Sequence, residues 1–314
     1  MPVRDSGHLQ ERFAWVFLLV ASLAFGASGP MARLATPASP FEAAFFRLVI
    51  AAFATGLACH RTLWPALRDL PRHEALRVLA AGAILGLHFS AFLWGLAHTS
   101  LPAAVSLVSL EPMAVLLVCG VVYKHLPTRT ETVGLILATL GALVVAQGAG
   151  HGEHRLEGDL GILLAVVLFG GYVALLRPVR HLGVLASASV IYASAALTVG
   201  TGLGLMHLIG HGGPQLWRLD LPWSSWAAMA GLGLVPTVLG HTLVQAASRS
   251  LRPAIVSLAS PGETVAGIAL GILLMGLWPE PVEAIGTVLI VAGMAWPLAA
   301  GMLGDVPALS ARRR

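Results

Sequence analysis

The sequence predicts an all-α integral membrane protein with ten transmembrane helices, arranged as two inverted five-helix repeats. Three observations lead to this prediction: the composition, the apolar segments with the charges between them, and a similarity between the two halves. Hydrophobic residues make up 57% of the chain and charged residues only 11%, whereas soluble domains carry about a quarter charged residues. A water-soluble fold of this length cannot bury so many apolar side chains. The chain is therefore expected to lie in a membrane.

Ten apolar segments recur along the chain, each long enough to cross a bilayer. A helix needs about 20 residues to span a hydrocarbon core about 30 Å thick, and a helix satisfies its own backbone hydrogen bonds there. The alternation of polar and apolar residues that barrel strands require is not seen. The predicted spans cover residues 13–32, 41–59, 76–98, 102–122, 131–149, 158–176, 185–206, 223–246, 253–275 and 284–303.

Basic residues are unevenly distributed between the two sets of loops. One set, together with both tails, holds 15 of the 19 basic residues. Arginine and lysine are retained on the cytoplasmic side, so residues 1–12 and 304–314 are expected to be cytoplasmic tails. Ten spans agree with this arrangement. A cleaved signal peptide over residues 13–25 is the rival interpretation, and it is disfavoured because the apolar run continues to Met31.

The two halves of the chain resemble each other. Residues 109–145 align without a gap on residues 261–297, at an offset of 152 that pairs Glu111 with Glu263. A second similarity, between residues 23–33 and 167–177, has an offset of 144.

These offsets divide the chain into two predicted domains. The first five-helix repeat covers residues 13–149, and the second covers residues 158–303. Because five is an odd number, the second repeat enters the membrane in the opposite direction. Inverted repeats of this kind are typical of secondary transporters, which bind their substrates near the membrane midplane.

Glu111 and Glu263 are the principal candidates for substrate or proton binding. Each lies near the middle of its span. The chain is expected to reach Glu111 from the outer side of the membrane and Glu263 from the cytoplasmic side. A charge at that depth costs on the order of 2.5–3.5 kcal/mol, so each side chain is expected to face the bundle interior or a wet cavity. Pro112, Pro261 and Gly262 are expected to break the helices beside them. The alternative is that both glutamates are protonated, hydrogen-bonded and purely structural.

Other polar residues within spans are further candidates for substrate or proton binding. His88 and His241 could relay a proton or form a structural hydrogen bond between helices, and Pro236 is expected to break the helix before His241. Arg47 is interpreted mainly as a structural or gating residue; it could extend to the membrane interface, pair with Glu42 or bind an anionic substrate group. Weaker candidates for lining a cavity are Trp94, Tyr172 and Phe25.

With these residues the sequence resembles the EamA family of the drug/metabolite transporter (DMT) superfamily. The segments that carry the resemblance are SLEP at 109–112, FFRLVIAAF at 45–53, GLILATLGALVVAQG at 134–148 and GTVLIVAGMAW at 286–296. Their order and spacing cover nearly the whole chain.

The resemblance implies a secondary transporter of the bacterial inner membrane. Such a protein exports small organic solutes (amino acids, metabolites or toxic compounds) by alternating access from a central cavity, with proton coupling in several branches. The expected partners are a small-molecule substrate and the lipid bilayer, with no nucleic acid, and the expected oligomeric state is a monomer or a homodimer.

No cofactor, metal site or enzymatic activity is predicted. The sequence contains no HExxH, GxSxG or GxxxxGK[ST] motif. The alternative function is a membrane-embedded enzyme that acts on a lipid-linked substrate. The sequence does not select a substrate, a direction of transport or a coupling ion.

Overall fold

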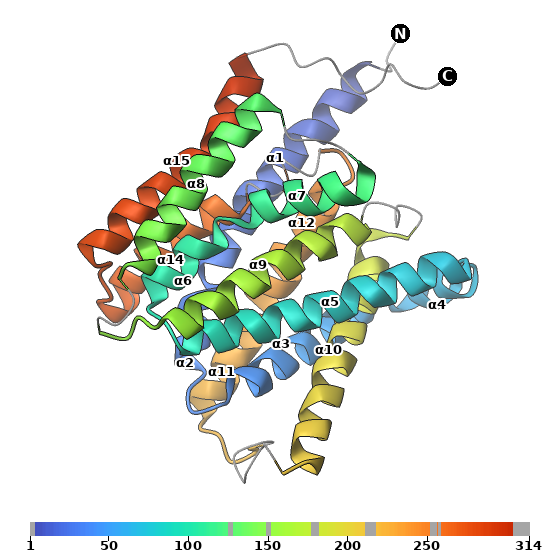
Figure 1. Cartoon of the computed structure of the whole chain (residues 1–314). Coiled ribbons are helices and arrows are strands. Elements are labelled where there is room, and N and C mark those ends of the chain that lie inside the picture. The colour runs from blue at the N-terminus through green and yellow to red at the C-terminus, as the bar shows by residue number, and fades with distance from the viewer. Residues whose placement is uncertain are drawn as a thin grey trace.

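A computed structural model describes residues 4–124, 128–148, 152–176, 182–210, 218–251, 256 and 259–303. The regular secondary structure of these residues is entirely helical, which confirms the all-α prediction (Figure 1). Of the predicted tails, residues 1–3 and 304–314 lie outside the described part. The elements are α1 (Arg4–Gly26), α2 (Ser28–Leu34), α3 (Pro40–Ala58), α4 (His60–Arg68), α5 (Arg72–Ala97), α6 (Leu101–Val108), α7 (Glu111–Tyr123), α8 (Arg129–Ala146), α9 (Leu156–Leu176), α10 (Val184–Leu208), α11 (Trp223–Leu232), the π-helix η2 (Gly233–His241), α12 (Thr242–Ala247), α14 (Ala259–Met275) and α15 (Pro281–Leu303).

Seven helical stretches of the described chain are long and apolar enough to cross a membrane, so the chain is a multi-pass membrane protein. They are Phe13–Leu34, Pro40–Ala58, Arg72–Ala97, Leu101–Val122, Leu156–Leu176, Val184–Leu208 and Trp223–Ala247. Three shorter apolar helices, Thr132–Ala146, Ser260–Met275 and Pro281–Gly293, coincide with the remaining predicted spans. That all ten segments cross the bilayer stays a prediction.

Three of the long stretches are interrupted. The stretch Phe13–Leu34 changes from α1 to α2 after Gly26, and the stretch Leu101–Val122 changes from α6 to α7 directly before Glu111. Pro112 occupies the first turn of α7, where the missing N–H of proline leaves no hydrogen bond unmade. The stretch Trp223–Ala247 contains η2, with Pro236 inside it. Short π-helical segments often occur at functional sites. Pro261 and Gly262 lie in the first turn of α14.

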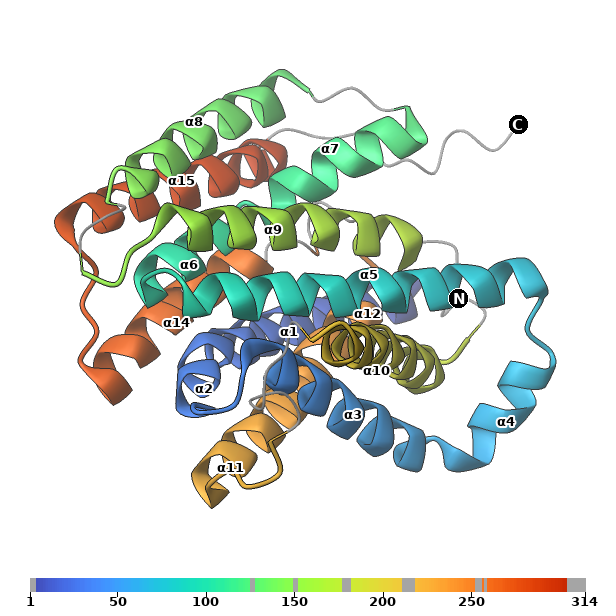
Figure 2. The ribbon, with the colours of Figure 1, turned by 60° about the horizontal axis from the view of Figure 1, so that its bottom comes forward.

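The helices pack side by side in pairs. The α8 helix lies along α15, α5 along α9, α3 along α10, and α1 along α14 (Figures 1 and 2). Small residues allow the close approach of α8 and α15. A Cβ atom added at Gly286 would lie 2.7 Å from the carbonyl oxygen of Gly141, and one at Gly141 would lie equally close to the carbonyl oxygen of Gly286.

The glycine contact between α8 and α15 predicts a stability difference between two matched substitutions. Gly286→Ala is expected to lower the midpoint of thermal unfolding, because its methyl group meets backbone at a cost of about 1–3 kcal/mol. Gly202→Ala, on α10, is the control, since an added Cβ there meets nothing within 4 Å. Unfolding of the purified protein in detergent measures both, and an equal midpoint for the two variants would contradict the packing argument.

The two ends of the bundle differ in the chain segments that they carry. α1 begins and α15 ends at the same end, which we call the terminal end (Figure 1). The opposite end, which we call the distal end, carries the turn between α5 and α6 and the beginnings of α9 and α15 (Figure 1).

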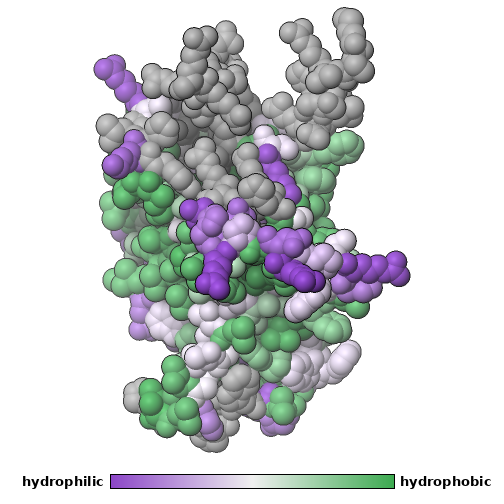
Figure 3. All heavy atoms as spheres, turned by 90° about the vertical axis from the view of Figure 1, so that its right-hand side faces the viewer, coloured by the Kyte–Doolittle hydropathy of each residue, from purple (hydrophilic) through white to green (hydrophobic). Residues whose placement is uncertain are grey.

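The α4 helix was not expected from the sequence, where its residues are interpreted as part of a basic loop. None of its residues is buried, and Trp64 is 74% exposed. Arg61 and Arg68 are exposed as well, and Figure 3 shows hydrophilic side chains projecting at the height of α4, with hydrophobic surface around them. A short helix with basic and aromatic side chains is suited to the membrane interface.

Candidate functional site

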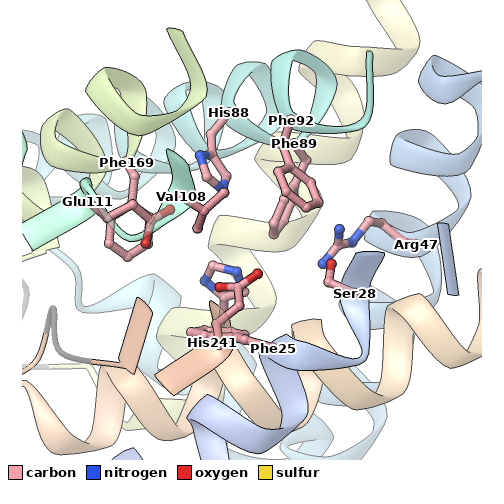
Figure 4. A pocket seen from close by; sticks show the side chains of 11 residues that line it. Phe25, Ser28, Arg47, His88, Phe89, Phe92, Val108, Glu111, Phe169 and His241 are labelled. Atoms are coloured by element: carbon pink, nitrogen blue, oxygen red, sulfur yellow. The ribbon is translucent and has the colours of Figure 1, made fainter. Parts of the chain in front are cut away.

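A cavity lies inside the bundle, where the interrupted helices meet. The space between its lining atoms, including space open to solvent, is about 320 Å³. Its eleven lining residues come from both halves of the chain (Figure 4) and are Phe25, Ser28, Arg47, His88, Phe89, Phe92, Val108, Glu111, Phe169, His241 and Glu263.

The structure brings the five polar candidates of the sequence analysis, and Phe25, into this one lining. Two weaker candidates are not among the lining residues. Trp94 stacks on His98 with ring centroids 4.3 Å apart, and Tyr172 packs behind the wall against Phe169, at 5.9 Å.

Arg47 is held from two sides and still has an unused donor. Its Nε donates a hydrogen bond of 3.0 Å to the hydroxyl of Thr237. Its guanidinium carbon lies 3.8 Å from the ring centroid of Phe89, an arrangement in which a cation is attracted to the ring face. The side chain is 1% exposed, and Nη1 has no hydrogen-bond partner in the described part of the chain. Arg47 is therefore a preorganised buried cation with a donor left free.

The pairing of Arg47 with Glu42, considered from the sequence, is not formed. The two carboxylate oxygens of Glu42 accept hydrogen bonds from the backbone N–H groups of Ser39, at 2.8 Å, and Arg218, at 2.5 Å. Glu42 caps the start of α3, in a capping box with Ser39. It therefore ties the segment before α11 to α3 and leaves Arg47 unpaired.

The two glutamates of the cavity have different surroundings. Glu111 is 3% exposed and accepts a hydrogen bond at Oε2 from the hydroxyl of Ser260 on α14. Glu263 is 7% exposed and has no ion pair within 4 Å and no hydrogen bond at its carboxylate among the described residues. Ser260 and Glu263 lie three residues apart and therefore on one face of α14. The α14 helix thus carries the free carboxylate of Glu263 and also Ser260, whose hydroxyl orients the carboxylate of Glu111.

The rings of the two cavity histidines, His88 and His241, lie near each other among phenylalanine rings. His88 Nδ1 lies 2.9 Å from the carbonyl oxygen of Ala165; since a carbonyl only accepts, Nδ1 carries the hydrogen, and Nε2 of the neutral ring is an acceptor. The rings of His88 and His241 are 6.4 Å apart. His241 also contacts Phe25, at 4.6 Å, and Phe89, at 5.0 Å. Figure 4 shows His88, Phe89 and Phe92 entering from α5, opposite His241 and Phe25.

Several residues of the site were not anticipated from the sequence. The offset of 144 between the halves pairs Phe25 with Phe169, and this correspondence could have pointed to Phe169. Thr237 follows Pro236 in a segment already marked as broken. Nothing in the sequence distinguishes Ser260 from other membrane serines, because its partner Glu111 lies 149 residues away.

Comparisons with known proteins agree with this architecture. Residues 12–147 match the model of the EamA-like transporter family. An uncharacterised transporter of Bacillus subtilis (strain 168), YxxF, is 24% identical over 293 residues, which cover 92% of this chain and 90% of YxxF. A protein of known crystal structure is 19% identical, with a TM-score of 0.66 over 93% of this chain and 97% of its own. That likeness concerns the fold. The family match over the first predicted repeat, residues 12–147, confirms the resemblance to the EamA-like transporter family that is seen in the sequence.

Proposed function

We propose that this protein is a transporter of the EamA type and that it carries small organic solutes through the central cavity by alternating access. The observation that carries the proposal is the composition of the cavity, where the cation Arg47 and the carboxylate of Glu263, which form no direct ion pair with each other, are buried together with Glu111. Burying unpaired charge is costly in a protein interior, so such groups are retained where a ligand uses them.

Two inverted five-helix repeats, over 13–149 and 158–303, underlie the proposed mechanism. Helix packing supports this division because the contacts occur in reciprocal pairs. α1 packs on α14 as α9, its counterpart in the second repeat, packs on α7. α3 and α10, and likewise α8 and α15, are counterparts that pack on each other. Rocking of one repeat against the other about such contacts opens a central site to each side in turn.

The proposed solute is a small zwitterion with an apolar side chain, such as an amino acid. The free Nη1 of Arg47 suits a carboxylate, since a guanidinium binds carboxylate oxygens well. The carboxylate of Glu263 and the acceptor Nε2 of His88 suit an ammonium group. Four phenylalanines, Phe25, Phe89, Phe92 and Phe169, complete the wall and suit an apolar side chain.

Proton coupling is proposed to run through Glu111 and Glu263. The two carboxyl groups share a buried cavity, where two like charges repel and a proton on one of them relieves the repulsion. His88 and His241 line the same cavity and are further polar groups beside the two carboxyl groups. The proton and the solute would then bind to the same carboxylates, so binding of one would exclude binding of the other.

In the membrane, we propose a bacterial inner-membrane location with both termini in the cytoplasm and with export as the direction of transport. The basic residues of the segment 61–77, which includes α4, and Lys124 at the end of α7 support this orientation, because basic residues are retained in the cytoplasm. Both segments lie away from the distal end (Figure 1). The cavity is lined by one chain, so a monomer is sufficient for transport, and a homodimer would contain two such sites. No observation favours the membrane-embedded enzyme.

Profiling followed by reconstitution tests the proposed function. Metabolites are first compared in the medium of cells expressing the chain and of cells carrying an empty vector. Amino acids enriched by the chain are then tested for counterflow in proteoliposomes that contain the purified protein. Counterflow that requires solute on both sides identifies a carrier. Uptake that is unaffected by internal solute would indicate a channel, and a new chemical product would restore the enzyme alternative.

A further inference from the structure

A second cluster of buried polar side chains lies at the distal end, outside the cavity. The ring of His154 stands between two carboxylates: Nε2 is 2.8 Å from Oδ2 of Asp159, and Nδ1 is 3.2 Å from Oε1 of Glu283. Each of the three residues is 1% exposed. Ionisable groups at this depth are retained when they are paired. We call His154, Asp159 and Glu283 the latch.

The latch holds the beginning of α6. The hydroxyl of Thr99 donates a hydrogen bond of 2.8 Å to Oδ1 of Asp159, at the start of α9. The hydroxyl of Ser100 donates to Oε1 of Glu283, at the start of α15, and accepts from the backbone N–H of Ala103 as the N-cap of α6. The α6 helix of the first predicted repeat is therefore fastened directly before its first residue, through Thr99 and its N-cap Ser100, to two helices of the second.

A guanidinium strengthens the same attachment from α2. Arg33 Nη2 donates a hydrogen bond of 2.7 Å to the carbonyl oxygen of Thr99, and Nη1 pairs with Glu153 at 2.8 Å. Three elements thus converge on the turn between α5 and α6.

The side chains of α6 fill the space between the latch and the cavity. Leu101 packs over Gly29 of α2 and Gly271 of α14, and Val105 packs beside Gly267. Leu101 and Val105 are each 1% exposed. One turn further along α6, Val108 lines the cavity itself. The α6 helix therefore separates the cavity from the distal end with tightly packed apolar side chains.

The break between α6 and α7 gives α6 a hinge. α6 has eight residues and ends at Val108, and Ser109 and Leu110 separate it from α7. A short helix that is tied at its N-terminal end and hinged at its C-terminal end can swing as a unit when the tie is released.

We propose that α6 is the gate of the cavity at the distal end, and that His154, Asp159 and Glu283 form the latch that keeps it closed. The inference rests on the proposed transport function for its purpose, since alternating access needs a gate on each side. Its mechanical content is independent of any solute: weakening the latch opens the cavity to the distal side.

Cysteine labelling of the cavity tests this gate without a substrate. Cys59 and Cys119 are replaced by alanine, and Ser28→Cys places a thiol in the cavity lining. A membrane-impermeant maleimide is added to intact cells, and in parallel to inside-out vesicles. Asp159→Asn or Glu283→Gln is expected to raise the labelling rate from the distal side on the order of tenfold, the effect of losing one hydrogen bond to a charged group. Glu157→Gln, an exposed neutralisation in the same turn of α9, is the matched control and is expected to leave the rate unchanged.

Unchanged labelling in both carboxylate variants, at normal membrane abundance, would overturn the proposal. If the carboxylate variants do not run as a single species in size-exclusion chromatography, Thr99→Val replaces them, because it removes only one hydroxyl. Its labelling rate from the distal side should then rise, and an unchanged rate would overturn the proposal. A rate increase confined to inside-out vesicles would support the latch but contradict the proposed orientation. Faster labelling in a chain that shows no counterflow would uphold the gate and reject the proposed transport, so the two failures are distinguishable.

Discussion

The Glu111→Gln, Glu263→Gln double variant is expected to lose transport while remaining folded. Glutamine keeps the size of each side chain and can still accept the hydrogen bond that Ser260 donates to Glu111. What it removes is the charge that we propose binds the ammonium group or the proton. A hydrogen bond to a charged group is worth about 1.5–3 kcal/mol, so the rate of counterflow should fall roughly ten- to hundredfold.

The single variants separate the two roles proposed for the glutamates. If one of them binds the coupling proton, its glutamine variant should retain solute exchange in proteoliposomes but lose acceleration by an imposed pH gradient. Glu157→Gln is the control, because Glu157 lies in the first turn of α9 with an exposed side chain, outside the cavity and the latch. Normal transport by the double variant, at matched abundance, would reduce both glutamates to structural residues.

The second large effect is expected from Arg47→Gln. Its loss removes the cation proposed to bind the solute carboxylate, and binding of a zwitterion should weaken roughly ten- to hundredfold. The thermal stability of the protein should not fall in proportion, because relief of the desolvation cost of the buried charge offsets the lost hydrogen bond to Thr237 and the lost contact with Phe89. A purely structural arginine would give the opposite pattern, a loss of stability with intact binding of solute.

Matched solutes make the Arg47 experiment specific. Binding of L-phenylalanine and of phenethylamine, which lacks the carboxylate, is measured by calorimetry on the wild type, Arg47→Gln and Arg47→Lys. The wild type should prefer the amino acid, and Arg47→Gln should abolish that preference. Arg47→Lys keeps the charge but not the planar fork, so part of the preference should return. An unchanged preference in Arg47→Gln would place the carboxylate site elsewhere. If profiling identifies a different amino acid, its own decarboxylated analogue replaces phenethylamine.

The sequence alone determined the class of protein and the location of its helices. Apolar segments of membrane-spanning length are local features, so each of the ten predicted segments contains a helix or a run of helices within the residues that the structure describes. The family resemblance, carried by short motifs such as SLEP at 109–112, was likewise readable from the sequence. The polar candidates were identified because a charged or imidazole side chain within an apolar segment is costly and therefore conspicuous.

The tertiary structure decided which of these residues meet and what each of them contacts. Arg47 was interpreted mainly as a structural or gating residue, but its unpaired donor becomes visible only when the partners around it are known. The hydrogen bond from Ser260 to Glu111, the contact of His154 with Glu283, and the hydrogen bonds from Thr99 and Ser100 to the latch join residues more than a hundred positions apart or in different predicted repeats. The α4 helix was missed because its short amphipathic pattern looks like a basic loop. Local hydrophobicity is encoded residue by residue, whereas charge pairing and close packing depend on atoms that only folding brings within a few ångströms.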